Sequence, residues 1–100
     1  AYGVRDYVRS QILRHWVYDF RKLGGRNVII PLHVELTGQG VILQAEILDT
    51  QRHATDPLYR DIAISARNAA LLSSPIKFPY GMSWNRMSFT FNLSARSALR

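Results

Sequence analysis

The sequence contains no cysteine, and no apolar run approaches the roughly 18 residues that a membrane-spanning helix needs. The first absence excludes disulfides, thiolate nucleophiles and cysteine zinc sites, although it assigns no cellular compartment. The second excludes a transmembrane segment within these residues, and no signal-peptide pattern is present. Because Ala1 is not a methionine, we expect residues 1–100 to be a single domain cut from a longer chain.

Acidic residues are few, with 7 Asp and Glu against 13 Lys and Arg, which gives a net charge of +6. This balance favours an anionic partner such as nucleic acid, lipid headgroups or an acidic protein. The arginines are scattered, however, and only the stretch 14–26 is locally dense, so a solvated surface explains most of them. A hydrophobic share of 47% predicts a compact core rather than disorder.

No catalytic constellation is present. His15, His33 and His53 lie in three different predicted elements, and none has the spacing to another histidine that metal sites use. His33 and Glu35 share one strand face, but such a pair is more typical of polar surface. The sequence also lacks a G-x-S-x-G elbow, a P-loop and a G-x-G-x-x-G motif. We therefore expect a non-enzyme without a metal or cofactor.

Hydrophobic periodicity predicts five elements. Apolar residues three and four apart predict a helix over about 4–18, and period-two alternation predicts strands over 28–36 and 41–49 around the glycine-bearing turn "TGQG". In the second of these strands Leu43, Ala45 and Ile47 are expected to share the buried face. A second helix follows over 54–72, where Asp56 is a good N-cap and Pro57 stands at the first helical position.

The last predicted strand is "RMSFTFNL", where apolar and polar residues alternate without a break. A strand–helix–strand unit has parallel strands, so the first strand fits between the second and the third. The predicted fold is α+β, in the order α-β-β-α-β, with a three-stranded sheet of order 2-1-3 and both helices on one face. Pro31 is the awkward residue, because proline in a central strand indicates a bulge or a shifted pairing.

In this topology the last strand lies at an edge of the sheet, with half of its backbone groups unpaired. We expect this edge to be the binding site. Its residues are Arg86, Met87, Ser88, Phe89, Thr90, Phe91, Asn92 and Leu93. Arg86 and Arg96 flank it, as guards against aggregation or as contacts for an acidic peptide. The residues after Leu93 either fold back over the edge or form a further helix.

The element order and its motifs resemble the C-terminal domain of the TolA family, in the TonB/TolA energy-transducer superfamily, from about Val4 to Leu93. The motifs are "DP" opening the second helix, its alanine-rich stripe, the prolines after it and the closing "F-x-F". Two features depart from related domains. His15 and Ser73 stand where many TolA domains carry a cysteine pair. The chain also lacks the Tyr-Pro motif of TonB domains, which favours TolA.

The resemblance implies a periplasmic domain of a single-pass inner-membrane protein, the membrane being reached only through an N-terminal anchor outside this sequence. It implies a Tol-Pal-type envelope complex that couples inner-membrane energy to the outer membrane. The domain would capture the N-terminal segment of TolB as an added strand. Pal and phage or bacteriocin domains are further partners that the resemblance suggests.

Two other functions remain open from the sequence. The nearer one is a TonB-type domain that binds the TonB box of an outer-membrane transporter through the same edge. The other is a small basic nucleic-acid-binding domain, argued from the charge of +6. Against nucleic acid, the outward strand positions are mostly Ser, Thr, Asn and Gln, without aromatic residues interleaved with arginine.

Overall fold

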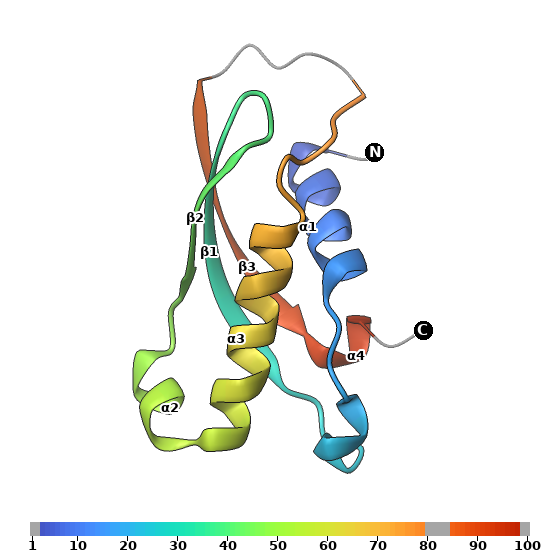
Figure 1. The fold of residues 1–100 in the computed structure, drawn as a ribbon, viewed down its shortest axis with the longest axis vertical. Helices are drawn as coiled ribbons and strands as arrows, with labels where there is room; N and C mark the ends of the chain where they lie inside the picture. The colour runs from blue at the N-terminus through green and yellow to red at the C-terminus, as the bar shows by residue number, and fades with distance from the viewer. Residues whose placement is uncertain (1–2, 80–84, 99–100) are drawn as a thin grey trace.

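The computed structural model describes residues 3–79 and 85–98, which combine one sheet with helices (Figure 1). The sheet has three strands in the order β2-β1-β3, and β1 is antiparallel to both neighbours. The strands are β1 (Ile29–Thr37), β2 (Ile42–Ile47) and β3 (Arg86–Ser94). The mixed class and the 2-1-3 order are therefore confirmed, and β2 and β3 run in the same direction as predicted.

Two helices, α1 (Val4–His15) and α3 (Pro57–Leu72), lie on one face of the sheet (Figure 1). Between them and the sheet is the core, to which β1 contributes its alternate residues Ile30, Leu32, Val34 and Leu36, all fully buried. The stripe of buried alanines in α3 lets the helix approach closely. A 2.9 Å hydrogen bond from Trp16 Nε1, directly after α1, to Ser65 Oγ of α3 ties the end of α1 to α3.

The start of α3 follows from the sequence as predicted, because the Asp56 side chain accepts from the Tyr59 N–H at 3.1 Å and Pro57 opens the helix. The predicted end of α1 at Tyr18 is wrong. Trp16 adopts an extended conformation, with φ −82° and ψ 101°, and buries its indole in the core. Three short helices complete the fold, and only α4 was among the predicted possibilities. They are η1 (Phe20–Leu23), α2 (Thr50–Thr55) and α4 (Ala95–Ala98).

Pro31 causes neither a bulge nor a shifted pairing in the sheet, because the N–H that proline lacks would point to the short strand β2. The Pro31 carbonyl accepts from Leu48 N at 3.2 Å, which shows that the Pro31 backbone faces β2 rather than β3. That position lies just past the last residue of β2, so proline removes a bond only at the end of this ladder. On the other side, Pro31 stands opposite Asn92 in an unbroken register.

A bulge lies instead at the start of β2, where the register shifts between Glu35 and Leu36. Leu36 is paired with Ile42, and Glu35 with Gln44, so Leu43 is the extra residue. The expectation that Leu43 shares the buried face with Ala45 and Ile47 is therefore wrong. Leu43 is 45% exposed, and Ile42 takes the position against the core.

The turn between β1 and β2 is fixed by the segment after α3. Ile76 N donates to the Gly40 carbonyl at 2.7 Å, and the Gly40 backbone has a φ of +86°. A Cβ atom at Gly40 would collide with the Ile76 backbone, whereas one at Gly25 would meet open space. Both glycines have positive φ, so alanine at either position is strained. Only at Gly40 does a steric conflict add to this strain.

We expect Gly40→Ala to lower the free energy of unfolding by about 3 kcal/mol or more, because the turn and the 74–76 segment must separate. Gly25→Ala has a similar φ and is the matched control, for which about 1 kcal/mol is expected from strain alone. Urea denaturation of both variants measures the difference. Equal losses would contradict the close contact between Gly40 and Ile76.

Candidate functional site

The outer edge of β3 presents backbone groups of every second residue. The Val28 carbonyl accepts from Ala95 N at 2.9 Å, and Gly38 N donates to the Asn85 carbonyl at 3.1 Å. The register between these two bonds is regular, so Phe89, Phe91 and the other odd-numbered residues direct their N–H and C=O groups to β1 and are hydrogen-bonded to it. The N–H and C=O groups of Ser88, Thr90 and Asn92 therefore point away from the sheet. These residues form what we call the β3 edge.

One carbonyl of the β3 edge is occupied by a side chain from α1. Arg5 Nη2 donates to the Thr90 carbonyl at 2.7 Å, and the same guanidinium lies 4.7 Å above the centre of the buried Phe91 ring. This arrangement satisfies the middle acceptor of the edge and places a positive charge beside it. A strand that pairs along the whole β3 edge has to displace Arg5 from Thr90.

The two arginines predicted to flank the edge have different surroundings. Arg86 Nε lies 3.1 Å from a Glu35 carboxylate oxygen on the outer face of the sheet, so its charge is partly compensated there. Arg96 follows the strand in α4, and its backbone N–H donates to Asn27 Oδ1 at 3.2 Å. Residues 95–98 form this helix beyond the end of β3, so they do not fold back along its edge.

The opposite edge, formed by β2, is more closely covered. Ile42 N donates to Ser74 Oγ at 3.0 Å, and the Gly40 carbonyl is taken by Ile76. Further along, Arg67 of α3 donates its Nε to the Ala45 carbonyl at 3.0 Å. The backbone groups of Gln44 and Glu46 are directed to β1. The residues whose backbone groups point outward in this half of β2 are therefore Ala45 and Ile47. The β2 edge therefore offers a shorter row of backbone groups than the β3 edge.

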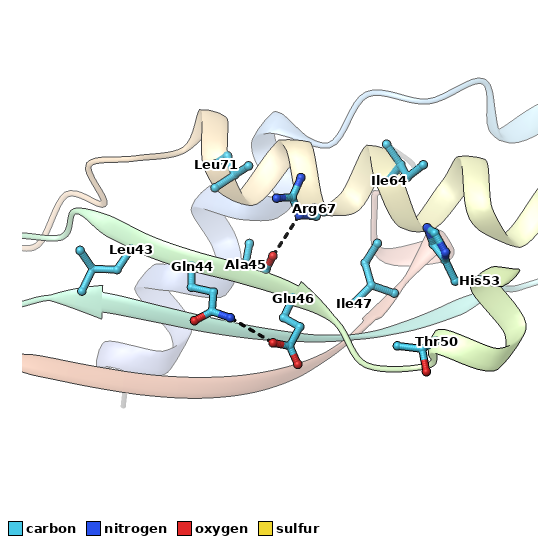
Figure 2. A pocket seen from close by; sticks show the side chains of 10 residues that line it. All are labelled: Leu43, Gln44, Ala45, Glu46, Ile47, Thr50, His53, Ile64, Arg67 and Leu71. Atoms are coloured by element: carbon cyan, nitrogen blue, oxygen red, sulfur yellow. Dashed lines mark hydrogen bonds between the residues drawn. The ribbon is translucent and has the colours of Figure 1, made fainter.

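Next to the β2 edge lies a groove of about 570 Å³ between β2 and α3 (Figure 2). Its apolar rim consists of three exposed side chains, Leu43 at 45%, Ile64 at 40% and Leu71 at 39%. Arg67 stands between Ile64 and Leu71 on α3, while Gln44 donates to Glu46 at 3.0 Å on the side away from the helix. We call this surface the β2–α3 groove.

The residues that sequence reasoning considered for chemistry are not brought together. His33 shares a 3.1 Å hydrogen bond with Thr90 Oγ1 on the outer face of the sheet, and its strand neighbour Glu35 contacts Arg86 instead. Within residues 3–79 and 85–98, no three His, Asp or Glu side chains cluster as a metal site would require. Burial raises the pKa of the Tyr59 hydroxyl, which belongs to the core and not to an edge.

Sequence reasoning located the β3 edge but missed the β2–α3 groove. All eight predicted residues, 86–93, lie in β3, and the predicted alternation is seen in full burial of Phe91 and Leu93 and exposure of Ser88, Thr90 and Asn92. Residues 82–84, which directly precede Asn85 and this strand in the sequence, lie outside the described residues. The unused signal for the groove was the spacing of Ile64 and Leu71 on α3, away from the buried alanines.

Comparison with protein-family models, with curated proteins and with solved structures finds no match for this chain. Among the helices in the part of the chain that the structure describes, none has the length and apolar character to cross a membrane.

We expect Arg5→Ala to leave the domain folded, at a cost of about 1 kcal/mol in stability, and to increase its self-association. The reason is that the variant uncovers the Thr90 carbonyl in the middle of an unpaired edge. Sedimentation velocity measures the association. Arg9→Ala, one turn further along α1, loses the same charge, so equal self-association of the two variants would show that Arg5 does not protect the edge.

Proposed function

We propose that this chain is a protein-binding module that captures an extended segment of a partner by adding it as a fourth strand to β3. The observation that carries the proposal is the β3 edge, where Ser88, Thr90 and Asn92 direct their backbone groups outward and Arg5 occupies the Thr90 carbonyl. Only another extended chain offers donors and acceptors at the matching spacing.

The electrostatics around this edge favour an acidic segment. Arg5 is exposed at the middle of the strand, and Arg9 stands one turn further along the same helix. When an added strand displaces the Arg5 guanidinium from Thr90, a carboxylate on that strand provides a replacement partner. A basic or neutral segment leaves Arg5 without this compensation, so the charge distinguishes between partners.

The wider setting that we propose is a Tol-Pal-type envelope complex, with the fold of the TonB/TolA superfamily and the TolB N-terminus as the captured segment. The element order and the position of the β3 edge support this assignment.

His15 and Ser73, at the family's cysteine positions, do not bond to each other here. His15 Nδ1 lies 2.9 Å from the Gln11 carbonyl, and Ser73 Oγ donates to Ala70. The contact between Gln11 and the Lys77 backbone, at 2.7 and 2.8 Å, ties α1 to the segment after α3.

A titration of the labelled domain with a peptide copying the TolB N-terminus from the same genome tests the proposal. We expect NMR amide shifts concentrated in residues 86–93, because main-chain pairing changes the surroundings of the outward amides. If a TonB-box peptide produces these shifts and the TolB peptide does not, the TonB-type function replaces the TolB assignment. If neither peptide binds and the fold is intact, strand capture by these partners is wrong.

Asn92→Pro separates strand addition from other binding at the same surface. Proline removes the outward N–H of residue 92. The hydrogen bonds to β1 are unaffected, because Asn92 stands opposite Pro31 at a register position whose backbone groups point away from β1. We expect at least tenfold weaker binding of the TolB peptide by calorimetry, while thermal stability changes little. Asn92→Ala keeps the N–H and is the matched control, which should bind as the natural domain does. Equal affinities of the two variants would rule out main-chain pairing at this position.

A further inference from the structure

The flank of α3 that faces the β2–α3 groove carries apolar side chains that are exposed. Ile64 and Leu71 are 40% and 39% exposed, whereas Ala63, Ala66 and Ala70 on the other side of the helix are buried against the sheet. Figure 2 shows Ile64 and Leu71 standing along the side of the helix above β2, with Leu43 on the strand below. Exposed apolar side chains gathered in this way mark an interaction surface more often than isolated ones do.

The backbone of β2 identifies the kind of chain that fits beneath this flank. Ala45 and Ile47 direct their backbone groups outward into the groove, and Arg67 takes the Ala45 carbonyl. The Arg67 bond uses Nε, which leaves the two Nη atoms of the guanidinium outside that interaction. An extended segment that pairs beside Ala45 and Ile47 displaces Arg67 Nε from the Ala45 carbonyl and lies within reach of the same guanidinium.

The spacing along α3 sets the pattern of this segment. Ile64, Arg67 and Leu71 follow one another in the groove, and the rise of a helix places the two apolar residues about 10 Å apart. Residues i and i+4 of a strand are about 13 Å apart and face the same side, with residue i+2 between them. We propose that the groove binds an extended peptide of the pattern apolar-x-acidic-x-apolar, whose carboxylate pairs with Arg67 and whose apolar residues cover Ile64 and Leu71.

A second copy of this chain does not supply that pattern through its edge strands. β3 contains no acidic residue, and in β2 the residues two positions before and after Glu46 are Gln44 and Leu48. The positive charge of the groove therefore favours a different polypeptide over the edge strand of a second copy. The site is separate from the β3 edge, because β1 lies between the two edge strands.

The probe is the blocked heptapeptide Thr-Val-Thr-Glu-Thr-Val-Thr, compared with the same peptide carrying Lys in place of Glu. We expect the Glu peptide to shift the amides of Ala45 and Ile47 and the methyl groups of Ile64 and Leu71. The Lys peptide should bind at least tenfold more weakly. Arg67→Gln should bring the two peptides to similar affinities, because the charge that distinguishes them is gone.

Ile64→Ser tests the apolar contact without touching Arg67, and about tenfold weaker binding of the Glu peptide is expected. Val17→Ser is the matched control, since Val17 is 83% exposed in the segment after α1, outside the groove lining, and should have no effect. No shifts in the groove at millimolar Glu peptide overturn the inference, as do shifts confined to β3. A concentration-dependent dimer that Ile64→Ser abolishes would overturn it in favour of self-association. Amide spectra of each variant confirm that the fold is intact.

Discussion

The central position of β1 determines the rest of this structure. Its even-numbered residues direct their backbone groups to β3 and its odd-numbered residues direct theirs to β2, so both ladders use the same strand. Both neighbours are consequently edge strands, and the register fixes which of their residues face outward. The same alternation places Ile30, Leu32, Val34 and Leu36 under the two helices. A change of register by one residue would expose this core and exchange the outward backbone groups together.

The two edges differ because different helices lie beside them. Beside β3, α1 contributes Arg5, whose guanidinium covers one carbonyl and brings a positive charge to the edge. Beside β2, α3 contributes Arg67 between Ile64 and Leu71, so the chemistry there is apolar with a positive charge at its centre. Each arginine satisfies an outward carbonyl and protects an edge from indiscriminate pairing. The two proposed binding surfaces therefore differ in chemistry, and β1 separates them.

Local patterns predicted the elements and their order, and through them the β3 edge. Alternation in residues 86–93 and the Asp56-Pro57 start of α3 depend on neighbours in sequence, which is why they were predictable. The bulge that exposes Leu43 was not, because it arises from how β2 meets the turn and the Ile76 segment. The early end of α1 depends on the core position of Trp16. The groove, and the hydrogen bonds by which Arg5 and Arg67 cover outward carbonyls, require contacts between elements that are distant in the sequence. No local pattern specifies such contacts.

The account depends most on the β3 edge being open in the isolated domain, and amide hydrogen exchange along β3 tests this directly. Amides bonded to β1 exchange slowly, whereas outward amides in contact with water exchange fast. The predicted result is an alternation, with Met87, Phe89 and Phe91 protected and Ser88, Thr90 and Asn92 exchanging quickly. Uniform protection across residues 87–92 would show that another chain or segment already pairs with this edge, and it would contradict the proposed binding site.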